Sequence, residues 1–200
     1  MTGHLIMISG LPGVGKTSVA EIAAARTGSV HLSIDAVEEW ILACGLTRGW
    51  QVGVAAYEAA RAMAELNLRL GRSVIIDAVN DSEDARQTWR AAAARTSSRI
   101  DFVHLVVADA QEHERRLSGR DRGLAYVGEP TWTDVQRRRA DYAAWSDEVV
   151  ELDTTVGLRM RLQAHLPRAS ARDEAASSLM VLRAGTRSSS GSMHKPLGQS

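Results

Sequence analysis

The chain has 200 residues, of which 44% are hydrophobic, and its formal net charge is zero. This length and composition suit one globular domain with a sizeable core and an extension. The charge is unevenly divided, because residues 1–167 carry a net charge of −3 whereas residues 168–200 carry a net charge of +3. The acidic balance of the longer segment argues against a broad nucleic-acid-binding surface.

Cysteine content and hydropathy exclude further classes of protein. The single cysteine, Cys44, excludes an internal disulfide and offers no metal-binding framework. No apolar run approaches membrane-spanning length, and the N-terminus lacks the basic and apolar regions of a signal peptide. We therefore expect a cytoplasmic protein with no membrane segment.

The first predicted strand, residues 5–8, is a short apolar run that leads through a glycine-rich loop into a helix. Gly10, Gly15, Lys16 and Thr17 match the phosphate-binding pattern G-x-x-x-x-G-K-[ST]. Glycines let backbone N–H groups converge on phosphate oxygens, and the helix N-terminus adds a partial positive charge there. The pattern predicts bound ATP, with Lys16 at the β- and γ-phosphates and Thr17 on Mg²⁺. The expected nucleotide-binding residues are Gly10, Leu11, Pro12, Gly13, Val14, Gly15, Lys16, Thr17 and Ser18.

Strands and helices alternate along the rest of residues 1–167. Apolar periodicity and capping signals predict helices at 16–26, 36–43, 54–70, 82–95, 109–117, 134–145 and 156–166. Short apolar runs predict strands at 30–34, 73–76, 102–107 and 148–152. This alternation indicates an α/β fold with a parallel sheet that is covered by helices on both faces.

Residues 168–200 lose this alternation. Their Ser-rich run at 188–192, followed by Pro196 and Gly198, is typical of a disordered tail. We therefore expect a domain at 1–167 and a disordered tail at 168–200. In the alternative interpretation, the short apolar run at 179–182 docks on the domain or on a partner.

Asp35 is the candidate catalytic base. Ligands of parallel α/β sheets bind at the carboxyl ends of the strands, and Asp35 follows the second strand. Phosphoryl transfer needs a carboxylate that orients the attacking hydroxyl. We predict that Asp35 fills this role beside an acceptor pocket that contains Trp40, Arg48 and Trp50; the alternative is a helix N-cap.

Asp77 is the candidate second metal-binding residue. It ends the apolar run at 73–76, and a carboxylate at this position can hold Mg²⁺ through water. The alternative is a turn residue at the end of a strand. Ala78 follows where a hydrolytic motor has Glu, and this favours transfer to a bound acceptor over activation of water.

The candidate lid residues are Arg116 and Arg120, which lie four positions apart and share a face if the helix extends that far. With Arg115 and Arg122 alongside, they form either a lid over the transferring phosphoryl group or a solvated face. The run at 137–139 is interpreted as a solvated face. Asp153 follows the last strand and is predicted to border the nucleotide base, with a simple turn as the alternative.

Several of these segments, together with others, match a pattern that is found in a known group of proteins. The matching segments are residues 10–17, Asp35, 74–80 with Arg86, 114–122, 130–135, 142–145 and 153–155. Together they resemble the small bacterial phosphate-loop kinases, which include chloramphenicol phosphotransferase-like, adenylylsulfate kinase-like and polynucleotide 5′-kinase-like proteins and many AAA family ATPases. The resemblance covers about residues 4–166. It implies a P-loop NTPase fold with a five-stranded core of nucleoside-kinase type, Asp35 as base or acceptor contact, and lid arginines near Arg116 and Arg120.

Three functional hypotheses follow. The first is an ATP- and Mg²⁺-dependent kinase that transfers a phosphoryl group to a hydroxyl of a small molecule. The second is a polynucleotide 5′-kinase, which the acidic balance of residues 1–167 disfavours. The third is a nucleotide-binding regulatory ATPase with little transferase activity. No Asn-Lys-x-Asp guanine-reading motif is present, and this disfavours a GTPase.

Overall fold

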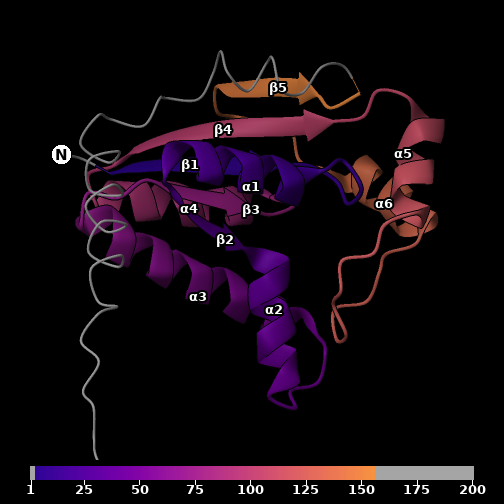
Figure 1. Cartoon of the computed structure of the whole chain (residues 1–200), viewed down its shortest axis with the longest axis horizontal. Helices are drawn as coiled ribbons and strands as arrows, with labels where there is room; N and C mark the ends of the chain where they lie inside the picture. Colours follow the sequence, from indigo (N-terminus) through magenta and orange to yellow (C-terminus); the bar gives the residue numbers. More distant parts are fainter. Residues whose placement is uncertain (1–2, 156–200) are drawn as a thin grey trace, which may run out of the picture. The chain divides into compact units, whose positions relative to one another are not determined.

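Five parallel strands form a single sheet in the computed structural model, which describes residues 3–155. The spatial order is β2-β3-β1-β4-β5, so β1 lies at the centre of the sheet (Figure 1). The strands are β1 (His4–Ser9), β2 (Val30–Ser33), β3 (Val74–Asp77), β4 (Arg99–Val106) and β5 (Val149–Asp153). The helices are α1 (Lys16–Thr27), α2 (Ile34–Ala43), α3 (Trp50–Arg69), α4 (Glu83–Arg95), α5 (Ala110–Ser118) and α6 (Trp132–Asp141). The predicted α/β class and the predicted parallel sheet are confirmed.

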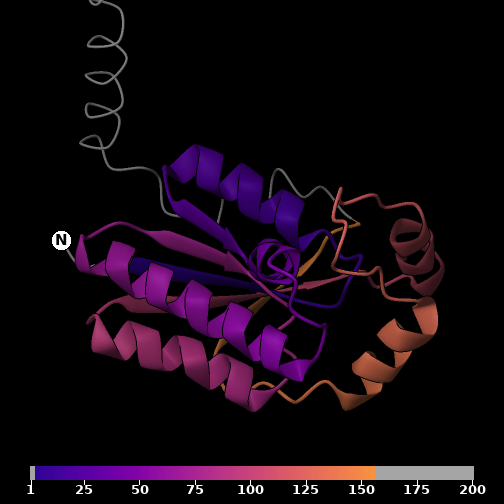
Figure 2. The same cartoon turned by 90° about the horizontal axis from the view of Figure 1, so that it is seen from below.

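Helices cover both faces of the sheet, because successive side chains of each strand point to opposite faces. Ile6 and Ile8 of β1 pack in the cluster with Val19 of α1, whereas Leu5 and Met7 pack in the cluster with residues of α3 and α4. Figure 2 shows α1 on one side of the sheet and α3 and α4 side by side on the other. These strand residues are buried on both faces, and each fully buried aliphatic side chain stabilises the fold by about 1.5–3 kcal/mol.

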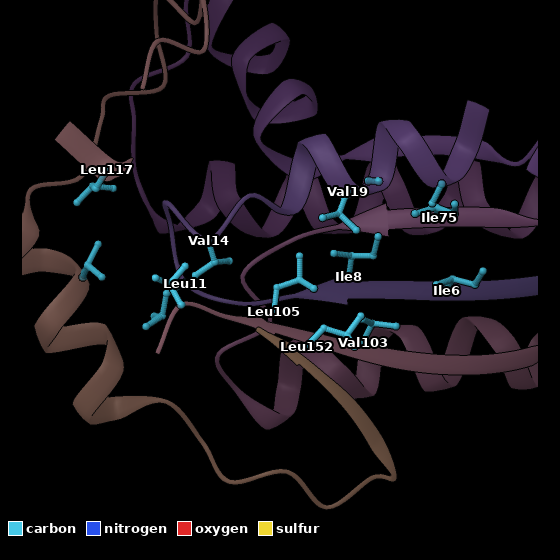
Figure 3. Packing of buried hydrophobic residues seen from close by; sticks show 14 residues of the cluster. Ile6, Ile8, Leu11, Val14, Val19, Ile75, Val103, Leu105, Leu117 and Leu152 are labelled. Carbon is cyan, nitrogen blue, oxygen red and sulfur yellow. The ribbon is translucent and has the colours of Figure 1, made fainter. Parts of the chain in front are cut away.

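The core continues into the loop after β1. Leu11 and Val14 of this loop are buried in the cluster that contains Leu105 of β4 and Leu117 of α5. Figure 3 shows Val14 and Leu11 beyond the end of β1, on the same side as Leu105. The glycine-rich loop is therefore held from beneath by apolar packing as well as by its own backbone.

The carboxyl ends of the central strands lie side by side. Ile8 pairs with Asp77 of β3, and Ser33 of β2 pairs with the same Asp77. Helices α5 and α6 lie at the end of the sheet toward which the strands point (Figure 1). None of the helices within residues 3–155 is long and apolar enough to cross a membrane.

Several predicted boundaries are wrong. Helix α2 begins at Ile34, so β2 ends earlier than predicted and Asp35 lies in the first turn of the helix. Helix α3 begins at Trp50, four residues earlier than predicted. Both helices extend because apolar residues outside the predicted limits continue the buried face, Ile34 in α2 and Val52 in α3.

The predicted helix at 134–145 instead runs from Trp132 to Asp141. Its start has a full capping box, in which Thr131 accepts from the Asp134 backbone N–H and Asp134 accepts from Thr131. It ends early because Tyr142 adopts an extended backbone conformation. The predicted helix at 156–166 and the predicted tail at 168–200 lie outside the described residues.

Helix α5 ends at Ser118, one residue beyond the predicted limit, with Gly119 as its C-cap residue. Asp109 caps its N-terminus as predicted, because its carboxylate accepts from the Gln111 and Glu112 backbone N–H groups. Arg120 therefore follows the helix, and the predicted helical face shared with Arg116 does not form.

Candidate active site

The glycine-rich loop joins β1 to α1 and has the backbone geometry of a phosphate-binding loop. Gly10 has φ 141° and leaves no room for a side chain, because a Cβ would lie 2.4 Å from the Leu105 carbonyl oxygen. Gly15 has φ 92° in the left-handed region and immediately precedes α1. The N-terminus of α1 therefore opens at the loop, where its unpaired N–H groups favour an anion.

Lys16 is the first residue of α1, and its ammonium group folds back to donate to the Leu11 carbonyl (3.2 Å). Burial lowers the pKa of Lys16 to about 8, although Asp35 and Asp77 oppose this shift by favouring the charged form. A bound polyphosphate supplies negative charge at the same place and favours the protonated ammonium.

Asp77 ends β3 beside the start of α1, and its side chain is 3% exposed. Its Oδ1 accepts from Thr17 Oγ1 (3.4 Å) and Ser33 Oγ (3.2 Å). Its Oδ2 accepts from His31 Nε2 (2.6 Å). The two predicted metal-binding residues, Thr17 and Asp77, are therefore adjacent. His31 is a further neighbour, which the sequence analysis did not assign to the site.

A cavity of about 610 Å³ opens next to these residues. It is lined by residues of the glycine-rich loop, α1, β2, α2, α5 and the segment after α5. Its polar lining consists of Lys16, Thr17, Ser18, Glu21, His31, Ser33, Asp35, Arg116, Arg120, Asp121 and Arg122. The cavity thus contains the candidate base, both candidate lid arginines and part of the predicted nucleotide-binding set, namely Gly13 and residues 15–18.

Asp35 is held in this cavity by an arginine from a distant part of the chain. Arg122 Nη1 donates to Asp35 Oδ2, and Arg122 Nε donates to Glu129. Within the described part of the chain, Asp35 Oδ1 receives no hydrogen bond, so this oxygen is available to an acceptor. The alternative role of N-cap is excluded because Ser33 occupies the N-cap position of α2.

Arg116 and Arg120 approach the cavity in different ways. Arg116 Nη1 donates to Thr154 Oγ1 (2.8 Å), and that hydroxyl in turn donates to the Val14 carbonyl of the glycine-rich loop (3.0 Å). Arg120 pairs with Glu129, and burial lowers its pKa. Arg116 is therefore tied to the phosphate-binding loop, whereas Arg120 belongs to the segment after α5.

Asp153 lies outside the lining of this cavity. Its Oδ1 accepts from the backbone N–H (2.8 Å) and the hydroxyl (2.7 Å) of Thr155, which is the turn that formed the alternative interpretation. Its neighbour Thr154 makes the contact with the loop. A contact of Asp153 with the nucleotide base stays a prediction.

The predicted acceptor pocket of Trp40, Arg48 and Trp50 is wrong. Both tryptophans are 74% exposed, and none of the three residues lines the cavity. Trp40 points outward because the opposite side of α2 carries the buried residues. Arg48 instead packs against Gly128, where a Cβ would lie 2.6 Å from its Nη1.

Two supporting residues were missed by the sequence analysis. The buried Glu39 of α2 accepts hydrogen bonds from the backbone of residues 125–127. Burial opposes its ionisation, but these N–H donors outweigh burial and lower its pKa. His113 of α5 donates from Nε2 to the Pro12 carbonyl (2.7 Å) and accepts from Arg139 at Nδ1 (2.8 Å). Arg139 therefore contacts a residue that supports the glycine-rich loop. It is exposed all the same, as are Arg137 and Arg138, so the predicted solvated face at 137–139 is confirmed.

Comparison with known families agrees with this geometry. Residues 5–142 match the family described as the AAA domain, and this range is more than half of the chain. The chain belongs to the AAA domain family. A sequence search of curated proteins gave no match to this AAA domain.

Solved structures of kinases share the fold of this AAA domain. A sugar kinase from Janibacter sp. is 20% identical, with a TM-score of 0.61, and the match covers 83% of this chain and 93% of that one. A gluconokinase from Sinorhizobium meliloti is 18% identical, with a TM-score of 0.57 and coverage of 92% and 98%. The APS kinase of Mycobacterium tuberculosis, solved in complex with AMPPNP and APS, is 19% identical, with a TM-score of 0.61 and coverage of 82% and 95%.

These neighbours come from the group that the sequence motifs resembled, so that resemblance is confirmed. The fold is the P-loop NTPase α/β fold, as predicted. At identities of 20% or less, the likeness establishes a shared fold and not a shared substrate.

Proposed function

We propose that this AAA domain is an ATP-dependent kinase that transfers the γ-phosphoryl group to a hydroxyl of a small molecule. The observation that carries the proposal is the single cavity in which Asp35 lies with Lys16 and Thr17 of the phosphate-binding loop. A carboxylate with an oxygen free to accept a proton, placed beside a phosphate site, suits a hydroxyl acceptor.

In the proposed reaction, the loop N–H groups and Lys16 hold the β- and γ-phosphates. Asp35 accepts a hydrogen bond from the acceptor hydroxyl and takes its proton as the oxygen attacks the γ-phosphorus. The bond from this phosphorus to the oxygen that bridges the β- and γ-phosphates breaks, and ADP leaves. Arg116 and Arg120 offset the negative charge on the phosphoryl oxygens. Positioning and charge neutralisation account for most of the catalysis of such a reaction.

The chain offers a fitting but incomplete site for Mg²⁺. Thr17 Oγ1 and Asp77 Oδ1 are hard oxygen donors that lie 3.4 Å apart. Within residues 3–155, no three His, Cys, Asp or Glu side chains gather as a metal site, so phosphate and water oxygens have to complete the coordination. When bound, Mg²⁺ would neutralise part of the phosphate charge. The acceptor hydroxyl would be bound by protein residues.

The test is a transfer assay with γ-labelled ATP, Mg²⁺ and a panel of hydroxylated acceptors that includes sugars, nucleosides and short oligonucleotides. We expect label to move to a small molecule in the wild type, and Lys16→Ala to abolish transfer. Asp35→Asn should lower kcat by about 10²–10⁴-fold, the typical contribution of a general base, while ATP affinity is kept. Asp84→Asn, which changes an exposed residue in the first turn of α4, is the matched control and should leave kcat unchanged.

Three outcomes contradict the proposal or parts of it. Full turnover in Asp35→Asn removes Asp35 from the mechanism. Label that moves only to oligonucleotides, with a steep salt dependence, favours the polynucleotide kinase. Tight ATP binding with no transfer to any acceptor, and slow hydrolysis that is insensitive to Asp35→Asn, favours the regulatory ATPase.

A further inference from the structure

The segment from 119 to 131, here called the lid loop, carries Arg120 and Arg122 into the cavity without forming a helix or strand. Its conformation therefore depends on contacts with other elements. An unsupported loop loses about 1–2 kcal/mol of backbone entropy for each residue that it orders on binding. Contacts that order the loop beforehand remove this cost from the catalytic cycle.

Glu39 provides the most concentrated of these contacts. The residue is 8% exposed, and its carboxylate lies under the lid loop. Oε1 accepts from the backbone N–H of Ala125 (2.6 Å) and of Tyr126 (3.1 Å), and Oε2 accepts from those of Tyr126 (3.0 Å) and Val127 (2.8 Å). Hydrogen bonds to an ionised carboxylate are stronger than neutral ones, and here one carboxylate binds three successive N–H groups.

Apolar packing and ion pairs act together with this carboxylate. Val127 is buried against Leu42 of α2 and Val52 of α3, directly beside the three bound N–H groups. On the cavity side, Arg122 pairs with Asp35 and Glu129. One helix, α2, therefore holds the lid loop at Glu39 and also carries the candidate base.

We propose that Glu39 is a positioning residue for phosphoryl transfer, because its carboxylate fixes the lid-loop backbone and thereby places Arg120 and Arg122 in the cavity. The inference rests on the proposed kinase function. Glu39 itself lines no part of the cavity and acts only through the two arginines.

The first test compares Glu39→Gln with Glu58→Gln, which makes the same change at an exposed glutamate of α3 that does not line the cavity. Glutamine keeps the size of the side chain but replaces one acceptor oxygen with an NH₂ group that opposes the loop N–H donors. We expect Glu39→Gln to lower kcat by about 10²-fold, the effect of a displacement of about 1 Å, with ATP affinity kept within about threefold. Glu58→Gln should keep the wild-type kcat, and an equal loss in both variants overturns the proposal.

A double-mutant cycle separates positioning from general support of the fold. In the background Arg120→Ala/Arg122→Ala, the kcat is already low, and Glu39→Gln should lower it no further. If Glu39 only stabilises the domain, its substitution lowers kcat independently of the two arginines. The fold losses in kcat from Glu39→Gln and from Arg120→Ala/Arg122→Ala then multiply. Multiplied losses overturn the proposal.

Hydrogen exchange tests the contact between Glu39 and the backbone of residues 125–127, here called the clamp, and requires no activity assay. We expect slow exchange at the amides of residues 125–127 in the wild type and fast exchange in Glu39→Gln, together with faster tryptic cleavage after Arg120 and Arg122. Fast exchange at these amides in the wild type overturns the clamp. This measurement uses the wild type alone, so it does not depend on whether a variant folds. If the wild type transfers phosphate to no acceptor, the proposed function fails, whereas the clamp is still decided by this experiment.

Discussion

At the scale of the residue, Lys16 combines two opposing influences. Burial near the loop lowers its pKa to about 8, and the carboxylates of Asp35 and Asp77 limit that shift. Lys16 therefore supplies a positive charge at the loop only while its ammonium group is protonated. The charge state of one side chain therefore links pH to phosphate binding.

We expect ATP affinity to be constant below about pH 8 and to fall above it. Phosphates favour the charged ammonium, so the pKa of Lys16 in the complex is higher than in the free protein, and binding above pH 8 takes up a proton. The affinity should fall by up to about tenfold per pH unit in this range. Calorimetry at pH 7 and pH 9, in buffers of different ionisation enthalpy, measures the proton uptake directly.

Lys16→Arg provides the control for this prediction, because arginine stays protonated throughout this range. Its ATP affinity should be the same at pH 7 and at pH 9. If the wild type binds ATP equally well at pH 7 and at pH 9 and takes up no proton at pH 9, Lys16 does not cause a pH dependence of ATP binding.

At the scale of the element, Arg86 of α4 joins its helix to the segment that precedes β5. Its buried guanidinium donates to the carbonyls of Asn80 (3.1 Å), Ala144 (2.6 Å) and Ala143 (2.7 Å) and lies 3.8 Å above the ring of Trp145. The backbone N–H of Ala143 in turn donates to the Asp81 carbonyl (2.9 Å), so it is not available for an intrahelical bond and α6 does not continue to Trp145.

Arg86→Met should strongly destabilise the fold. The substitution leaves three carbonyl acceptors without their donor, and we expect a loss of about 3–5 kcal/mol in the free energy of unfolding. For a domain of this size, this corresponds to a drop in Tm of about 10 °C. Circular dichroism melting curves measure the effect.

Arg95→Met on the same helix is the matched control, because Arg95 is exposed and the buried Glu65 that it contacts also pairs with Arg61 and Arg69. Glu65 keeps two partners in this variant, so we expect a loss of less than about 1 kcal/mol. A similar Tm for both variants contradicts the role assigned to Arg86.

At the scale of the whole domain, the candidate site joins segments that are far apart in the sequence. Thr17 lies beside Asp77, and the loop carbonyl of Val14 accepts from Thr154. A ligand that binds this arrangement binds only the folded chain. Its binding free energy therefore adds to the stability of the fold.

ATP with Mg²⁺ should raise the Tm of the wild type. At a ligand concentration about a hundred times Kd, the added stability is about 2.7 kcal/mol, or about 5–10 °C in a domain of this size. Asp77→Asn should reduce the part of the shift that requires Mg²⁺, since one of the two candidate oxygen ligands becomes a neutral amide.

Differential scanning fluorimetry with ATP alone, and with ATP and Mg²⁺, checks this prediction for both proteins. Ser98→Ala, far from the cavity lining, is a control that should keep the full shift. An undiminished Mg²⁺-dependent shift in Asp77→Asn removes Asp77 from the metal site.

Much of the fold follows from patterns within short stretches of sequence. The phosphate-binding loop lies within residues 10–17, so its conformation depends on glycines and a helix start that are adjacent in the chain. The strands are apolar runs, and β3 is buried at every position, as its sequence predicted. The alternation of strands with helices then leaves few topologies other than a parallel sheet.

The predictions that failed depended on which neighbours cover an element. Trp40 was assigned to the acceptor pocket from its position near Asp35, but the buried side of α2 is determined by α3 and the lid loop. Arg120 could share a helical face with Arg116 only if the helix extended that far, and α5 ends at Ser118. Helix ends and exposed faces are set by packing as well as by local sequence, and local patterns alone predict them poorly.

The P-loop fold and the glycine-rich loop proposed to bind phosphate could thus be predicted from local patterns, because both depend on residues close together in the chain. The completion of the site depends on contacts that only the folded chain makes. Arg122 meets Asp35 across 87 positions, and Glu39 binds the lid loop across 86 to 88. No local pattern encodes which side chain meets which backbone at such separations, since that depends on the packing of α2 and the lid loop in three dimensions.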